Sequence, residues 1–139
     1  MDFSEIIKIG TSDRKSEIVE YKNTASACGS GGLEVYATPA MIALMEGAAL
    51  AAMGRLLPPG WTTVGTELEV KHLSATPLGM KVYASAELLA IDGRSLSFKV
   101  EAFDEAGKIG EGTHKRYIVE SEKFLAKLEN KKEDAAKRL

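Results

Sequence analysis

An apolar run, "ATPAMIALMEGAALAAMG" at residues 37–54, constrains the fold most, because it holds a single charged residue, Glu46. Thr38 is a good N-cap, and Pro39 follows it at a first-turn position where a missing N–H costs nothing. The run therefore predicts a helix that begins at Thr38 and ends at Leu57, before "PPG". Small residues recur along it at intervals of three or four: Ala43, Gly47, Ala51 and Gly54. We expect a sheet to pack closely against that stripe.

The remainder alternates between apolar and polar residues with period two, which is typical of antiparallel strands. Strands are expected at 16–22, 66–72, 80–90, 96–102 and 108–120, with turns at "TPLG", "DGR" and "DEAG". Gly110 and Gly112 in the last of them indicate a bulge or a close approach of another backbone. An amphipathic helix anchored by Phe124, Leu125 and Leu128 is expected at 121–135, followed by a charged tail.

These elements predict an α+β fold in one domain, residues 1–139, with one helix cradled by a curled sheet. Residues 23–34, rich in glycine and serine, are expected to be a flexible loop, which either serves as a lid or binding loop or is simply disordered. The net charge of −2 gives no reason to expect nucleic acid or an anionic membrane as a partner. The helix is too short for a membrane span, and the lone Cys28 favours the cytoplasm.

Glu46 is the residue that a packed helix explains least, because an unpaired buried carboxylate costs on the order of several kcal/mol. The alternation of the strand at 66–72 turns His72 toward the helix, so we expect His72 to partner Glu46. Thr38 lies two turns before Glu46. A hydroxyl, a carboxylate and an imidazole together are the parts of a hydrolytic site.

Plainer interpretations stand beside that one. Thr38 serves as a helix cap in one, and His72 is a hydrogen-bonded core residue in another. His114 and Arg116 are expected at solvated strand positions, where a cation could also meet the phosphates of a nucleotide-bearing substrate. No metal-ligand spacing occurs, since His72 and His114 are the only histidines.

The fragments "VYATPAMIALMEGAA", "VGTELEVKHLSATPLGMKV", "AELLAIDGRSLSFKVEAFDEAGKIGEGTH" and "EKFLAKL" together carry a resemblance. Over residues 35–130 the chain resembles the hotdog-fold acyl-coenzyme A thioesterases, and most of all the fluoroacetyl-coenzyme A thioesterase group. The resemblance implies catalytic roles for Thr38, Glu46 and His72. It also implies that Gly65 borders the thioester, and that two subunits pair edge to edge with active sites at the interface.

The resemblance implies hydrolysis of an acyl-coenzyme A thioester by a homodimer or higher homo-oligomer without a cofactor. Glu46 would be the nucleophile or the base that activates water, His72 the proton carrier, and the Gly65 N–H an oxyanion donor. The fluoroacetyl-specific members have an aromatic, proline-containing lid that "NTASACGSGGLEVY" lacks, so a short-chain acyl thioester is the expected substrate. Two alternatives stay open: a hotdog hydratase or dehydratase, and a non-catalytic acyl-coenzyme A binding module.

Overall fold

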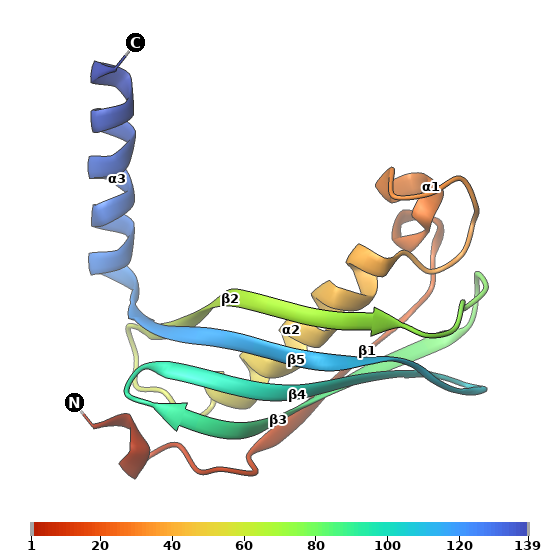
Figure 1. Ribbon diagram of the computed structural model, residues 1–139, viewed down its shortest axis with the longest axis horizontal. Coiled ribbons are helices and arrows are strands. Elements are labelled where there is room, and N and C mark those ends of the chain that lie inside the picture. Colours follow the sequence, from red (N-terminus) through yellow and green to blue (C-terminus); the bar gives the residue numbers. More distant parts are fainter. Residues whose placement is uncertain (1, 139) are drawn as a thin grey trace.

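Five antiparallel strands form one curled sheet around a long helix, α2, in a computed structural model that describes residues 2–138 (Figure 1). The strands are β1 (Ser12–Ile18), β2 (Trp61–His72), β3 (Lys81–Asp92), β4 (Ser95–Asp104) and β5 (Gly107–Glu120). Their order across the sheet is β1-β3-β4-β5-β2. The α+β class and the helix cradled by a curled sheet are therefore confirmed, and β1 and β2 are the two edge strands.

The helix α2 (Thr38–Gly54) presents its larger side chains to the sheet. The residues that it buries are Met41, Leu44, Met45, Ala48, Ala49, Ala52 and Met53. The small-residue stripe lies on the other side, where Ala43, Ala51 and Gly54 are exposed, so the expectation that the sheet packs on this stripe is wrong. Large apolar side chains bury more area against the sheet and so decide which way the helix faces.

The predicted alternation of β3 and β4 is confirmed. Their inward residues are all fully buried: Val82, Ala84, Ala86, Leu88, Leu96, Phe98, Val100 and Ala102. The turn between these strands places Gly93 at a φ of 62°, a left-handed conformation that suits glycine. The alanines of β3 keep the sheet surface low beneath the helix, which lets α2 lie close to it.

The N-terminal third differs from the expectation in two places. The first strand is Ser12–Ile18 and not 16–22, because its register against β3 runs from Ser12 opposite Glu87 to Ile18 opposite Lys81. Residues 3–5 and 21–23 form the 3-10 turns η1 (Phe3–Glu5) and η2 (Tyr21–Asn23).

Part of the expected loop at 23–34 is a short helix, α1 (Ala25–Cys28), beside the N-terminal end of α2 (Figure 1). The Thr24 hydroxyl accepts a hydrogen bond from Ala27 N at 3.3 Å, which caps the helix at its start. Gly29 ends it in a left-handed conformation with a φ of 73°. Two local signals in the sequence, a threonine cap and a glycine stop, thus fold a segment whose composition suggests only a loop.

The C-terminal helix α3 (Ser121–Lys137) projects from the end of β5 away from the sheet (Figure 1). None of its residues is buried, and only Phe124 of the three expected anchors is half-buried. Leu125 and Leu128 are 60% and 45% exposed, so their predicted anchoring role is wrong in this chain. Within residues 2–138, no helix is both long and apolar enough to cross a membrane.

Candidate active site

Thr38 and His72 meet at the N-terminal end of α2. Thr38 lies in the first helical turn, and Ala37 occupies the cap position without a side-chain hydrogen bond, so the interpretation of Thr38 as the cap is wrong. Its hydroxyl instead lies 2.8 Å from Nδ1 of His72, the last residue of β2. The helix start therefore delivers a hydroxyl to an imidazole rather than to its own backbone.

A cleft of about 340 Å³ opens over this pair. Its walls are Ala25, Ser30, Val35, Tyr36, Thr38, His72, Leu73, Ser74 and Ala75. The buried Tyr36 hydroxyl turns away to donate to Glu17 Oε2 at 2.6 Å, and burial and this bond together raise the Tyr36 pKa. Small residues of α1 and the following turn thus cover the pair, and Tyr36 supplies a fixed apolar wall.

The His72 ring keeps one nitrogen without a partner. Its Nε2 atom is buried, yet no described residue forms a hydrogen bond with it. Burial lowers the pKa of His72 below its ordinary value of 6.5, which favours the neutral ring at pH 7. A buried polar atom without a partner is rare enough to indicate a functional position.

Glu46 lies further along α2 and does not pair with His72 in this chain, which corrects that expectation. Its Oε2 lies 3.5 Å from Nη1 of Arg116, on β5. It also lies against Gly65 of β2, where a Cβ atom would come within 2.6 Å of Glu46 Oε2. Glycine at position 65 is what lets the carboxylate approach the strand.

His114 and Arg116 are buried, 1% and 6% exposed, so their expected placement in solvent is wrong. The Arg116 guanidinium donates from Nε to Thr63 Oγ1 at 2.7 Å and from Nη2 to the Thr63 carbonyl at 2.9 Å. Its Nη1 lies 3.1 Å from His114 Nε2. Arg116 is therefore held on the inner face of the sheet beside Glu46 and points away from solvent.

The sequence contains a signal for this network. Counting back by twos along β5 from the buried Ile118 gives Arg116, then His114 and Gly112, all on the face toward α2. Thr63 was missed because the strand was expected to begin at residue 66, whereas β2 begins at Trp61.

The candidate site residues thus form two separate groups in one chain. Thr38 and Glu46 are eight residues apart on α2, which is about 12 Å along a helix axis. One group pairs Thr38 with His72 at the end of β2, and the other pairs Glu46 with Arg116 beside Gly65. Each group borders β2, whose outer edge has no strand paired to it among the described residues.

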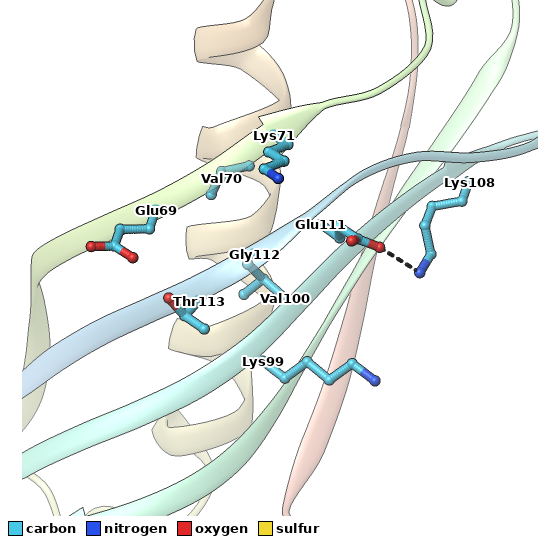
Figure 2. A pocket seen from close by; sticks show the side chains of 9 residues that line it. All are labelled: Glu69, Val70, Lys71, Lys99, Val100, Lys108, Glu111, Gly112 and Thr113. Carbon is cyan, nitrogen blue, oxygen red and sulfur yellow. Dashed lines mark hydrogen bonds and ion pairs between the residues drawn. The ribbon is translucent and has the colours of Figure 1, made fainter.

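A second hollow, of about 640 Å³, lies elsewhere, on the face of the sheet away from α2 (Figure 2). Its charged side chains include Lys108 and Glu111, which pair at 2.9 Å. It holds no imidazole and none of the four residues of the two groups. Among residues 2–138, no cluster of three or more metal-binding side chains occurs either.

A curled antiparallel sheet around one long helix that carries a hydroxyl and a carboxylate is the architecture of the hotdog-fold thioesterases. The family model described as "FlK: Fluoroacetyl-CoA-specific thioesterase" matches residues 19–122, and the chain belongs to this family.

Comparisons with individual proteins support the same family. The fluoroacetyl-CoA thioesterase of Streptantibioticus cattleyicolor is 46% identical over 98 residues, which cover 70% of each chain. A solved structure of the fluoroacetyl-CoA thioesterase FlK is 37% identical and superposes with a TM-score of 0.85 over 90% of this chain and 97% of the other. A thioesterase superfamily member from Thermus thermophilus is 28% identical, with a TM-score of 0.86 over 94% and 96% of the two chains.

Proposed function

We propose that the protein hydrolyses a short-chain acyl-coenzyme A thioester to a carboxylic acid and free coenzyme A. The observation that carries the proposal is the hydrogen bond of 2.8 Å between Thr38 and His72 at a cleft, on the same helix as Glu46. The family supports the reaction class. Its solved members include complexes with fluoroacetate and CoA, and with acetyl-CoA.

The residues divide the chemistry among them. Glu46 either attacks the thioester carbonyl or takes the proton of an attacking water, and the Arg116 guanidinium lies beside its carboxylate. His72 relays the proton released by the attacking water to the departing sulfur, Thr38 fixes the imidazole through Nδ1, and the Gly65 N–H donates to the developing oxyanion. No step in this scheme calls for a metal or a cofactor.

We further propose that the working unit is a homodimer in which β2 strands pair antiparallel, edge to edge. A free edge of twelve residues is a ready template for such pairing. A twofold axis near Leu68 and Glu69 would set His72 opposite Gly65 of the partner subunit. That register brings Glu46 of one subunit to the unpartnered Nε2 of the other subunit's His72, and so joins the two groups into one site. Sedimentation of the purified chain as a monomer would contradict this arrangement.

The substrate class follows from the cover over Thr38 and His72. Ala25 and Ser30, which line the cleft, are small, so we propose that it admits acyl groups beyond fluoroacetyl. The lone cysteine, exposed at Cys28, supports a reducing, cytoplasmic location.

A panel of acyl-coenzyme A esters assayed for free thiol tests the function. We expect thiol release from acetyl, fluoroacetyl and larger short-chain esters. No release from any ester, combined with tight binding, would favour a binding module. Loss of an enoyl chromophore without free thiol would favour a hydratase.

A further inference from the structure

His114 has no role in the scheme above, yet it is buried on the inner face of β5 with both ring nitrogens engaged. Its Nδ1 lies 2.9 Å from the Glu67 carbonyl oxygen on β2. Its Nε2 lies 3.1 Å from Arg116 Nη1 on its own strand. The ring therefore connects the edge strand to the arginine that accompanies Glu46.

The two partners determine which nitrogen carries the proton. A carbonyl oxygen only accepts, so Nδ1 of His114 must be the N–H that donates to Glu67. A guanidinium only donates, so Nε2 must be the acceptor for Arg116. Protonation of Nε2 would place two donors, and two cations, against each other. His114 is thus neutral in this arrangement, with its proton on Nδ1.

The surroundings of His114 favour that state. Arg116 on β5 and Glu46 on α2 are the charged groups that face the ring, and Phe98 of β4 packs beside it with ring centroids 6.2 Å apart. Burial lowers the pKa of His114 most, and the charge of Arg116 lowers it further. The bond to Glu67 and the charge of Glu46 raise it, and the net result is a lowered pKa.

With His114 in place, all three nitrogens of the Arg116 guanidinium have a hydrogen-bond acceptor. Thr63 accepts from Nε and from Nη2, and His114 accepts from Nη1. Nη1 carries two hydrogens, of which His114 takes one, and Glu46 Oε2 lies 3.5 Å from that nitrogen. Without the acceptor at His114, only the two bonds to Thr63 would orient the guanidinium, and nothing on the β5 side would hold Nη1 beside the carboxylate.

We propose that His114 is a positioning residue, which acts as a neutral hydrogen-bond acceptor to hold the Arg116 guanidinium beside Glu46. This rests on the proposed thioesterase function, because its effect on the reaction passes through Glu46. His114 itself contacts no reacting atom.

Three variants separate positioning from simple packing. His114→Leu removes the acceptor and should lower kcat by about tenfold or more, since misplaced catalytic groups cost up to about a hundredfold, with KM within about twofold. His114→Gln offers an amide oxygen near the place of Nε2 and should recover most of kcat. Lys115→Leu, on the outward side of the same strand, is the matched control and should match the wild type.

Two kinetic results would overturn the proposal: wild-type kcat in His114→Leu, or a kcat in His114→Gln as low as in His114→Leu although both variants are folded. A purely structural role would lower the unfolding temperature of both variants and leave kcat alone.

Ring-nitrogen NMR of the wild-type protein tests the same claim without turnover. The chain has two histidines, so His114→Gln assigns both ring signals. We expect the neutral tautomer with the proton on Nδ1 of His114 at pH 7. A protonated ring, or a proton on Nε2, would overturn the proposal even if the protein proves to be a thioesterase. Conversely, a failure of thiol release on every ester leaves this spectroscopic test of the network intact.

Discussion

The two faces of the sheet treat their carboxylates in opposite ways. On the outer face, Glu101 has Lys108 at 2.7 Å and Lys99 at 3.7 Å. On the inner face, Glu46 has one cation, Arg116, at 3.5 Å, and accepts no hydrogen bond from any described residue. Glu101 is thus paired with two lysines, whereas Glu46 has a single cation near it, on the side of the sheet that carries α2. This difference in bonding, rather than the volume of a hollow, is why we propose Glu46 as the reactive carboxylate.

The largest effect is expected for Glu46→Gln, which removes the charge but keeps the size of the side chain. Its kcat/KM should fall by about 10²–10⁴-fold, because the amide neither attacks a carbonyl nor accepts a proton. Thiol release from an ester that the wild type hydrolyses measures it. Undiminished turnover would contradict the proposed role of Glu46 in the reaction.

Gly112→Ala should cost the most stability. A Cβ atom there would overlap the Glu69 carbonyl oxygen and come within 2.8 Å of the Val70 Cα, both of the β2 backbone. We expect a loss of about 1–3 kcal/mol in the free energy of unfolding, measured with urea. Thr113→Ala, one residue along and facing outward, is the control and should change it by less than about 0.5 kcal/mol. Equal losses of stability in both variants would contradict the close approach of Gly112 to the β2 backbone.

Gly65→Ala should damage activity more than stability. The added Cβ would lie 2.6 Å from Glu46 Oε2 and so push the carboxylate from its place. We expect kcat/KM to fall by roughly 10- to 100-fold, within the range for a small misplacement. Gly54→Ala serves as its control, because nothing lies within 4 Å of a Cβ there. Comparable thiol release by the two variants would contradict the claim that Gly65 makes room for the Glu46 carboxylate.

Stability should respond to pH in two separate windows. Burial lowers the pKa of His72 and His114 below 6.5. The native state thus binds fewer protons than the unfolded chain as the pH falls through 6.5, and stability drops there. The bond from Lys108 lowers the pKa of Glu101 below 4.5, so the outer face loses stability only at more acidic pH. A free energy of unfolding that stays flat between pH 6.5 and 4.5 would contradict the neutral histidines.

The smallest effect is expected for Glu101→Gln. Exposed ion pairs contribute little, so the free energy of unfolding should change by less than about 1 kcal/mol, and thiol release should stay at the wild-type rate. It is the same substitution as Glu46→Gln on the opposite face of the sheet. A large loss of activity in Glu101→Gln would therefore contradict the assignment of the reaction to the inner face.

Local patterns in the sequence predict much of this fold and less of the site. Alternation is decided by each strand alone, which is why the inward faces of β3 and β4 follow from it. The choice of partner is not local. Glu46 meets Arg116 rather than His72 because the position of β5 beside β2, and the space left at Gly65, bring the arginine to the middle of the helix.

The start of α2 shows a second limit. Thr38 is of a residue type that commonly caps helices, yet Ala37 occupies the cap position and Thr38 is the first helical residue. The Thr38 hydroxyl forms its hydrogen bond with His72 instead. Local preference yielded here to a contact between residues 34 positions apart, which no window of neighbouring sequence reveals.

Mixing inactive subunits tests most directly whether the two groups of residues unite across a dimer. One variant carries both Thr38→Ala and His72→Ala, the other carries Glu46→Gln, and each is expected to be inactive alone. A purified heterodimer of the two would contain one intact site, and should recover about half of the wild-type thiol release. A heterodimer as inactive as its parents would contradict a site built from both subunits.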